Sequence, residues 1–302
     1  MTAPPLVVTP GDPRGIGPEV AVRALRTLDV DAVLFGDIDA LRVHAPELQI
    51  VDSLRPGRGL RALVLPSSSE PVEVVAIREA VRACLDGTAR ALVTGPIHKA
   101  RLAARGFGYP GHTELLGALC GVDEPVMAFV GGSVRVALVT VHLPLREVPD
   151  AVTRAKVLHT LRTADRALRE RLGFERPRLA VCGLNPHAGD AGLLGREEID
   201  IIGPACADAR ALGLDVWGPI SAETAFYQAD RSDMVVAMYH DQGLAPLKRV
   251  DFGRSVNWTL GLPIVRTSVD HGTADELVGT GKASAASMEA AIELALQLTD
   301  GR

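Results

Sequence analysis

Three of the eight histidines each follow a short apolar run of the kind that forms a buried β-strand, and these are His142, His187 and His240. The carboxyl ends of parallel strands meet at one edge of a sheet, so three such imidazoles can converge on one cation and leave positions open for water or substrate. Neutral imidazole suits zinc and its neighbours in the transition series. Each histidine alone could be a simple strand-end hydrogen bonder, and the spacing matches no local metal motif. Three in equivalent places predict a catalytic divalent-metal site.

A second set of residues could bind anions. His112 and Thr113 stand in PGHTELLG, just before an apolar helical run, where Thr113 could cap the helix and backbone amides favour an anion. Lys248, Asn257 and Arg266 add two cations and an amide after His240. Taken singly, each could serve in ordinary surface pairing or in a turn. Together they predict a pocket for a phosphate and a carboxylate, in which Arg266 can bind an oxyanion bidentately.

The stretch AMYHDQGLAPLK, residues 237–248, carries both kinds of group. His240 is the metal-ligand candidate and Lys248 the cation for substrate. Asp241 follows His240 directly, and carboxylates commonly orient metal-bound imidazoles. We therefore expect Asp241 to orient an imidazole or to hold the turn.

The elements that would position these groups form an alternating pattern. Short β-branched runs alternate with longer amphipathic runs along the chain, which is typical of an α/β protein with a largely parallel sheet. The runs VMAFVGG and VRVALVTV are close enough to be antiparallel neighbours, and residues 56–71 are expected to form a surface loop. Nearly every predicted strand ends in a polar turn rich in Gly or Pro, where ligands of open α/β sheets bind. These turns are VVTPGDPRGIGPE, LVTGPIHK, VTVHLPL, CGLNPHAGD, AMYHDQG and VRTSVDHGT.

Composition excludes several classes of protein. The 302 residues are 47% hydrophobic and 23% charged, as in a soluble globular protein. A net charge of −5 without a basic block argues against nucleic-acid binding. No apolar run is long enough to span a membrane and no signal peptide is evident, so we expect a cytoplasmic protein. The four cysteines are far apart and in apolar stretches, which favours buried free thiols over disulfides or a zinc ribbon.

Familiar nucleotide and acyl-transfer motifs are absent. GDPRGIG after the first strand is not GxGxxG, and GTGK at Gly279 lacks the other residues of a phosphate loop. No GxSxG or Cys/His pairing is evident. Three histidines beside an anion pocket could also activate water, so a metal-dependent phosphate-ester hydrolase is an alternative hypothesis.

Taken in order, several blocks resemble the 4-hydroxythreonine-4-phosphate dehydrogenase family, which acts in pyridoxal phosphate synthesis. The resemblance runs from Thr9 to Lys282, over nearly the whole chain. It implies a two-domain α/β/α fold like that of isocitrate and isopropylmalate dehydrogenases, with the active site in the interdomain cleft. The blocks are TPGDPRGIGPE, TGPIHKA, GHTELLG, VHLPL, LNPHAGDAGLLGREEIDII, MYHDQGLAPLK and VNWTLGLPIVRTSVDHGTADELVGTGKA.

The resemblance also implies roles for residues. The metal ligands would be His142, His187 and His240, shared between the subunits of a homodimer, with zinc the expected metal and Mg, Mn or Co as alternatives. His112, Thr113, Lys248, Asn257 and Arg266 match substrate-binding positions, and Lys248 or His112 could shuttle a proton. The NAD site would include Asp270, His271, Gly272 and Thr273. Approximate domains are residues 1–125 plus 270–302, with part of the NAD site, and residues 126–269, with the metal ligands and the dimer interface.

The implied reaction is the NAD- and metal-dependent oxidative decarboxylation of 4-phosphohydroxy-L-threonine to 3-amino-2-oxopropyl phosphate. Two residues depart from the family pattern. Glu223 stands where Asp is expected, and Asp190 stands where Glu is expected after NPHAG. These departures leave open a related substrate, such as threonate or erythronate 4-phosphate.

Overall fold

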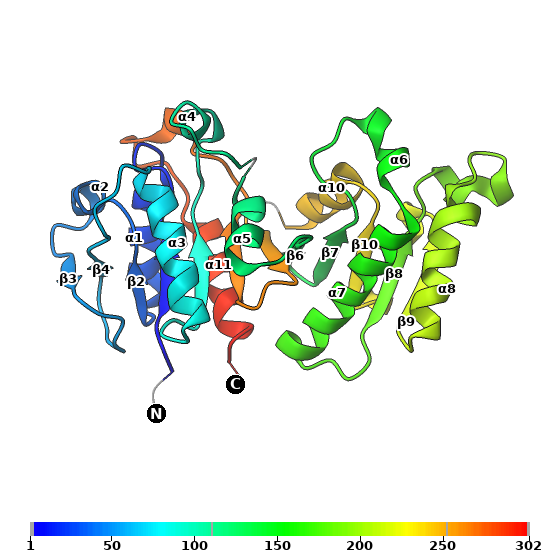
Figure 1. The fold of residues 1–302 in the computed structure, drawn as a ribbon, viewed down its shortest axis with the longest axis horizontal. Coiled ribbons are helices and arrows are strands. Elements are labelled where there is room, and N and C mark those ends of the chain that lie inside the picture. The colour runs from blue at the N-terminus through cyan, green and yellow to red at the C-terminus, as the bar shows by residue number, and fades with distance from the viewer. Residues whose placement is uncertain (1–2, 110, 252, 301–302) are drawn as a thin grey trace. The chain divides into compact units, whose positions relative to one another are not determined.

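The computed structural model describes residues 3–109, 111–251 and 253–300. The chain forms two compact units: unit 1 comprises Met1–Pro125 and Leu262–Arg302, and unit 2 comprises Val126–Gly261. Both are built from strands and helices, so the predicted α/β class is confirmed (Figure 1). Among the described residues, no helix is long and apolar enough to cross a membrane.

The strands of unit 1 form an all-parallel arrangement in the order β3-β4-β2-β1-β5-β12. Strands β1, β2, β5 and β12 are buried on both faces, as expected for a parallel sheet covered by helices, whereas Gln49 and Ile50 of the edge strand β3 are exposed. The strands are β1 (Leu6–Thr9), β2 (Ala32–Leu34), β3 (Gln49–Val51), β4 (Arg61–Leu63), β5 (Ala91–Thr94) and β12 (Arg266–Val269).

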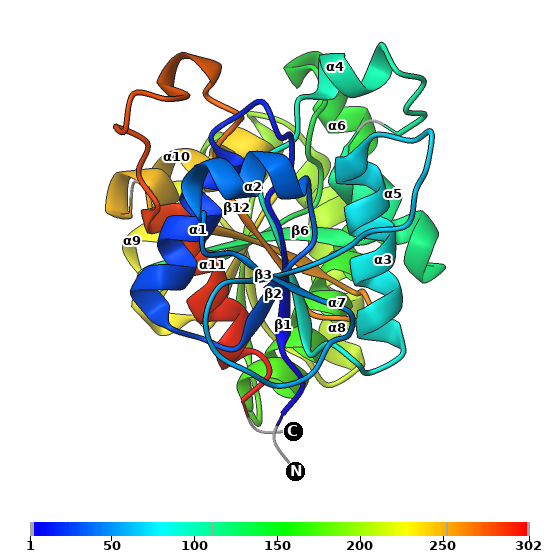
Figure 2. The same ribbon diagram turned by 90° about the vertical axis from the view of Figure 1, so that its left-hand side faces the viewer.

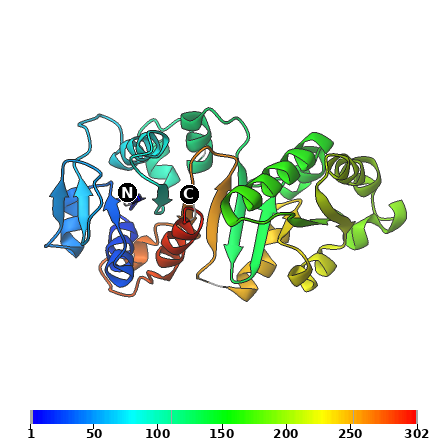
Figure 3. The same cartoon turned by 90° about the horizontal axis from the view of Figure 1, so that it is seen from below.

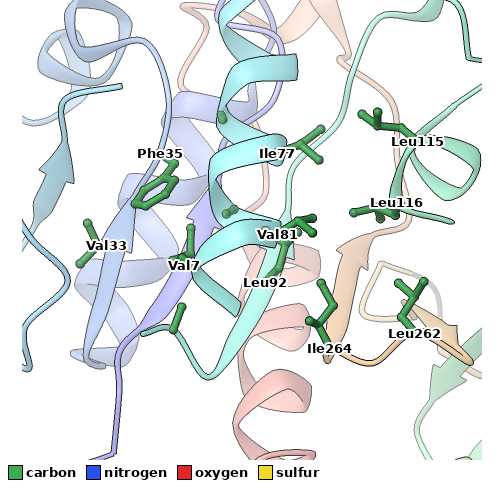
Figure 4. Packing of buried hydrophobic residues seen from close by; sticks show 14 residues of the cluster. Val7, Val33, Phe35, Ile77, Val81, Leu92, Leu115, Leu116, Leu262 and Ile264 are labelled. Carbon is green, nitrogen blue, oxygen red and sulfur yellow. The ribbon is translucent and has the colours of Figure 1, made fainter. Parts of the chain in front are cut away.

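Helices cover both faces of this sheet. Figure 2 shows α1 and α11 on one side of the unit 1 strands and α3 and α5 on the other. Ile77 of α3 and Leu116 of α5 pack with Val7, Phe35 and Leu92 in one buried cluster (Figure 4). The helices of unit 1 are α1 (Gly17–Leu28), α2 (Ile38–His44), α3 (Val72–Leu85), α4 (Lys99–Ala103), α5 (His112–Cys120) and α11 (Ala286–Gln297), with a 3₁₀ turn at Asp275–Leu277.

The strands of unit 2 follow the order β11-β6-β7-β10-β8-β9. The pairs β11–β6 and β6–β7 are antiparallel, which confirms the predicted antiparallel neighbours, and β7, β10, β8 and β9 run parallel. The strands are β6 (Val126–Gly131), β7 (Val134–Leu138), β8 (Arg178–Cys182), β9 (Asp215–Ile220), β10 (Met234–Ala237) and β11 (Val256–Leu260).

Helices also lie on both faces of the unit 2 strands. In Figure 3, α7 and α8 lie on one side and the gold helix α10 on the other. The longest helix, α7, begins where Thr153 Oγ1 accepts a hydrogen bond from Lys156 N at 3.2 Å, and it ends at Gly173 with φ 73°. The helices are α6 (Val148–Ala151), α7 (Arg154–Leu172), α8 (Gly203–Ala211), α9 (Ala222–Tyr227) and α10 (His240–Val250). A π-helix lies at Glu198–Ile202, 3₁₀ turns lie at Leu145–Glu147 and Ala229–Arg231, and a turn with left-handed residues lies at Pro186–Gly192.

Two local expectations differ from the structure. Residues 56–71 are not a loop throughout, because β4 lies within them and buries Arg61 and Ala62. The chain returns to unit 1 after Gly261, whereas the sequence placed this change at residue 270. Residues 266–268 belong to unit 1 because β12 forms a parallel ladder with β5.

Turns at the carboxyl edge of unit 1 pack backbone against backbone. Gly95 N donates to Thr9 O at 2.6 Å, and Asp12 N donates to Pro96 O at 3.0 Å. A Cβ on Gly95 would lie 2.2 Å from Pro10 O, and one on Gly17 would lie 1.9 Å from the same oxygen. The glycines of GDPRGIG and TGPIHK therefore let the ends of β1 and β5 approach each other.

We predict that Gly95→Ala lowers the free energy of unfolding by about 2 kcal/mol or more, because the new methyl group would meet main-chain atoms that cannot rotate away. Gly108→Ala is the matched control, since a Cβ there has no neighbour within 4 Å. Urea denaturation of both variants measures the difference. Equal stabilities would show that the edge can relax and that this close approach is not a constraint.

Candidate active site

The three candidate metal ligands follow three neighbouring strands of unit 2. Strands β7, β10 and β8 are adjacent and parallel, with Val136 opposite Val235 and Leu179 opposite Met234. The candidate histidines His142, His240 and His187 follow these strands in that order. All three therefore leave the sheet at the same edge, as their positions in the sequence predict.

His142 and His240 come together within one chain. Their ring centroids are 5.7 Å apart, a separation that suits two imidazoles on one cation. The described residues contain no group of three or more His, Cys, Asp or Glu side chains that could hold a metal ion. The pair therefore fits as part of a ligand set for a divalent cation, and the set needs a further ligand to be complete.

The turn after β10 fixes His240 through its two following residues. Asp241 Oδ1 lies 2.7 Å from His240 Nδ1, which is the contact expected of a carboxylate that orients an imidazole. With the proton on Nδ1, the lone pair of Nε2 is available to a metal. Gln242 Oε1 accepts from Met238 N at 2.7 Å, and Gln242 Nε2 donates to Gly183 O at 2.8 Å. Gln242 thus ties the end of β10 to the end of β8.

His187 has a different local partner. It lies in the turn Pro186–Gly192, and its Nδ1 is 4.0 Å from Oε1 of Glu223, at the start of α9. Both side chains are exposed in the single chain. The described part of the chain therefore pairs His142 with His240 and directs His187 toward a carboxylate.

In unit 1, the buried guanidinium of Arg266 contacts the ring of His112. Arg266 is 2% exposed, and its Nε and Nη2 donate to Thr94 Oγ1 at 3.1 and 2.7 Å. Nη2 also lies 3.3 Å from His112 Nδ1, so the guanidinium donates to that ring nitrogen. This places the imidazole proton on Nε2, which is buried and has no hydrogen-bond partner among the described residues. His112 Nε2–H is therefore available to a bound ligand.

The charges of this pair are set by burial. Burial lowers the pKa of Arg266 to about 9, so the guanidinium is still protonated at neutral pH. Burial, followed by the positive charges of Arg266 and Lys99, holds the pKa of His112 well below its usual 6.5. A neutral imidazole that donates a hydrogen bond beside a permanent cation suits an anionic group such as a phosphate.

The other predicted substrate residues lie in separate places. Thr113 is inside α5, and the helix begins after Gly111 without a side-chain cap, so the predicted capping role of Thr113 is wrong. Lys248 lies in α10, and Asn257 lies in β11 opposite Phe129. His112, Thr113 and Arg266 thus belong to unit 1, and Lys248 and Asn257 to unit 2.

The predicted NAD residues form the turn after β12. Asp270 N donates to Ser287 Oγ at 3.2 Å, and Thr273 O accepts from Ile16 N at 3.0 Å. His271 Nδ1 lies 2.8 Å from Gly272 O, and Nε2 is buried without a hydrogen-bond partner in the part of the chain that the structure describes. A Cβ on Gly272 would have no neighbour within 4 Å. The turn thus offers an open main chain and an imidazole acceptor to a ligand.

Arg101 ties this turn to the first strand. Its Nη1 donates to Oδ2 of Asp12 at 2.7 Å, and its Nη2 donates to Asp275. Asp12 is 1% exposed and also accepts from Arg14 N at 2.9 Å. Hydrogen bonds from Thr273 and Arg101 hold the pKa of Asp275 below its usual range. The Arg101 guanidinium therefore holds the turn after β12, which carries the predicted NAD residues, against the segment GDPRGIG.

Sequence reasoning assigned no role to four residues that hold these groups in place: Thr94, Arg101, Glu198 and Gln242. Thr94 and Gln242 stand in polar turns that the sequence had marked as strand ends. Their partners are distant along the chain, so the pattern pointed to the turns and not to the contacts.

A family model described as "Pyridoxal phosphate biosynthetic protein PdxA" matches residues 19–295. The chain belongs to this family. The resemblance seen in the motif blocks is therefore confirmed.

Curated relatives extend the match over the full length. A 4-hydroxythreonine-4-phosphate dehydrogenase from Thioalkalivibrio sulfidiphilus is 42% identical and covers 98% of this chain and 97% of its own. One from Stenotrophomonas maltophilia is 45% identical, with 99% and 98% covered. Both relatives are named as dehydrogenases.

Solved structures agree with this relationship. The 4-hydroxythreonine-4-phosphate dehydrogenase from Klebsiella pneumoniae is similar, with a TM-score of 0.91 at 38% identity and 99% and 100% of the two chains covered. A terephthalate 1,2-cis-dihydrodiol dehydrogenase from Burkholderia xenovorans has a TM-score of 0.69 at 30% identity, with 98% of each chain covered. The fold is thus shared by dehydrogenases named for different substrates.

We predict that His112→Gln reduces the loss of stability in acid. The pKa of His112 is lower in the folded state than its unfolded value of 6.5, so the unfolded chain takes up the extra proton first. The stability that this neutral imidazole contributes is therefore present above pH 6.5 and is lost as pH falls from that value toward the folded-state pKa. Between about pH 7 and pH 5, Tm should fall less for His112→Gln than for the wild type. His44→Gln is the control. If Tm falls as much for His112→Gln as for the wild type, His112 is not a buried neutral imidazole.

Proposed function

We propose that this protein is an NAD- and divalent-metal-dependent dehydrogenase that converts 4-phosphohydroxy-L-threonine to 3-amino-2-oxopropyl phosphate. The full-length match to 4-hydroxythreonine-4-phosphate dehydrogenases carries this proposal, at 42% identity over 98% of the chain. The site residues add support, because an imidazole pair and a buried anion-binding pair are what a metal-assisted reaction of a phosphorylated substrate requires. We place the enzyme in the cytoplasm.

In this reaction the secondary alcohol carbon gives a hydride to NAD+ and the hydroxyl gives up its proton. The resulting β-keto acid loses CO2, and the carbon that carried the carboxylate takes a proton. A divalent cation, zinc in our proposal with Mg, Mn or Co as alternatives, would supply polarisation of the substrate oxygens. His142, His187 and His240 would hold it, and Asp241 would keep His240 Nε2 free for it.

The remaining roles follow from charge. Arg266 and His112 Nε2–H would bind the substrate phosphate or carboxylate, with Thr113, Lys248 and Asn257 as further contacts. His112 Nδ1 already accepts a hydrogen bond from Arg266. Because the pKa of His112 is well below its usual value, the imidazole carries only one ring proton at neutral pH. His112 is thereby a hydrogen-bond donor to substrate and a poor proton shuttle. We assign proton transfer to Lys248.

We assign NAD binding to Asp270, His271, Gly272 and Thr273. The main chain at Gly272 is open, and the buried Nε2 of His271 meets no donor from residues 3–109, 111–251 and 253–300. Neither feature requires the GxGxxG motif, and this motif is absent after the first strand. Arg101 would hold this turn in place when the cofactor binds.

A second candidate keeps the reaction type and changes the substrate to threonate or erythronate 4-phosphate. The observation that favours it is the contact between His187 and Glu223, at 4.0 Å, because Glu223 departs from the family pattern beside a proposed metal ligand. A ratio of kcat/KM values for the two substrates decides between them. Release of inorganic phosphate without NAD would instead indicate a hydrolase.

We predict that purified protein forms NADH from 4-phosphohydroxy-L-threonine, that exhaustive chelation abolishes this activity, and that Zn²⁺, Mn²⁺ or Co²⁺ restores it. His142→Ala and His240→Ala should each lower kcat/KM by about 100-fold or more, because each removes one side of the imidazole pair. NADH absorbance follows the reaction. Full turnover after complete metal removal would rule out the metal role.

The dimer part of the proposal has its own test. One chain pairs His142 with His240, so a shared site would take His187 from the partner subunit. We predict that mixing His187→Ala with His240→Ala, with subunit exchange demonstrated, restores roughly a quarter of wild-type activity, since half of the dimers are mixed and each has one intact site of two.

The control mixture is His142→Ala with His240→Ala. These two residues lie together in one chain, so every site of this mixed dimer lacks one of them and activity should stay low. Restoration in the control mixture, or in neither mixture, would contradict this division of ligands.

A further inference from the structure

The turn that carries His187 has an unusual main chain. Five consecutive residues, 187–191, have positive φ values between 43° and 80°. Four of them are not glycine: His187, Ala188, Asp190 and Ala191. A run of left-handed residues with side chains is unfavourable on its own, so neighbouring structure must hold it in place.

Glu198 is the residue that holds this turn. It is 5% exposed and is the first residue of the π-helix Glu198–Ile202. Its Oε1 accepts from Leu184 N at 2.7 Å and from Asn185 N at 2.8 Å, and its Oε2 lies 3.1 Å from Asn185 Nδ2. One buried carboxylate thus fixes the main chain on the amino-terminal side of His187.

The same carboxylate also lies against the left-handed turn itself. A Cβ on Gly189 would be 2.6 Å from Glu198 Oε2, so only glycine allows this approach. Glu197 adds a hydrogen bond between its Oε2 and Asn185 Nδ2 at 2.6 Å. The turn is therefore fixed on both sides of His187 by the segment that begins the π-helix, a helix type found frequently at functional sites.

We propose that Glu198 is a positioning residue that sets the direction of the His187 imidazole and thereby the metal affinity of the enzyme. This rests on the proposed role of His187 as a metal ligand. Both oxygens of Glu198 are occupied by main-chain and amide donors, so Glu198 acts through His187 and does not bind the metal itself. If the turn relaxed to right-handed angles, the Cα–Cβ bond of His187 would point elsewhere.

The test compares Glu198→Gln with Asp200→Asn. Both remove one negative charge from the π-helix, but Asp200 is exposed and pairs only with Arg196 among the contacts that the structure describes. In Glu198→Gln an NH2 group replaces one oxygen and faces N–H donors, which should loosen the turn. We expect Zn²⁺ and Co²⁺ to bind the assembled Glu198→Gln protein 10- to 100-fold more weakly than the wild type and the Asp200→Asn protein to bind them equally well.

Two further readouts separate positioning from a general loss of structure. The visible spectrum of bound Co²⁺ should change in Glu198→Gln, and hydrogen exchange should quicken at the amides of Leu184 and Asn185. Adding Ala191→Gly to Glu198→Gln should recover part of the affinity, because glycine accepts the left-handed angle without a Cβ. If Glu198→Gln does not fold, Asn185→Ala is the second variant. It removes one of the three hydrogen bonds to Glu198, together with the hydrogen bond to Glu197, and should weaken metal binding by a smaller factor.

Wild-type affinity in Glu198→Gln and in Asn185→Ala would overturn the positioning role. A wild-type protein that binds neither Zn²⁺ nor Co²⁺ would instead overturn the proposed metal-dependent function. The two failures are therefore distinguishable.

Discussion

The side-chain amide of Gln242 is the contact on which the metal-ligand candidates most depend. It accepts from Met238 N at 2.7 Å and donates to Gly183 O at 2.8 Å, so it joins the carboxyl ends of β10 and β8. On the other side of β10, Thr140 Oγ1 donates to Met238 O at 2.7 Å and joins the end of β7. Three parallel strands whose ends are tied in this way can deliver side chains to one edge with little freedom, which catalytic geometry requires.

Unit 1 fixes its carboxyl edge by a different device. There the main chains of Pro10, Gly95 and Pro96 approach so closely that a single methyl group at Gly95 would overlap an oxygen. Proline removes a donor and fixes φ, and glycine removes the Cβ, so such contacts need no side chains to hold them. Arg101 then adds a charged tie between Asp12 and Asp275. A main chain made rigid in this way leaves the open position at Gly272 and the Nε2 atom of His271 to meet a ligand.

Strand ends were predictable from sequence because they depend on local pattern. The apolar runs before His142, His187 and His240 marked the ends of β7, β8 and β10, and the structure confirms that these strands are parallel neighbours. Contacts between distant residues were not predictable in this way. Arg101 and Asp275 are far apart along the chain, and no local pattern joins them. Strand β4 was missed because it has only three residues and begins with Arg61, a buried arginine that the sequence does not distinguish from a surface one.

Of the two departures from the expected family pattern, the backbone explains Asp190 and does not explain Glu223. Asp190 sits in the left-handed turn with φ 43°, and Asp is among the few residues besides glycine that adopt this region readily. Its short side chain is therefore explained by the main chain and needs no reference to substrate. Glu223 has helical geometry at the start of α9, so nothing in the backbone favours Glu over Asp there. Its carboxylate lies 4.0 Å from His187, and the extra methylene moves that charge relative to a proposed metal ligand. In the proposal of a related substrate, Glu223 and not Asp190 is therefore the departure that would bear on substrate choice.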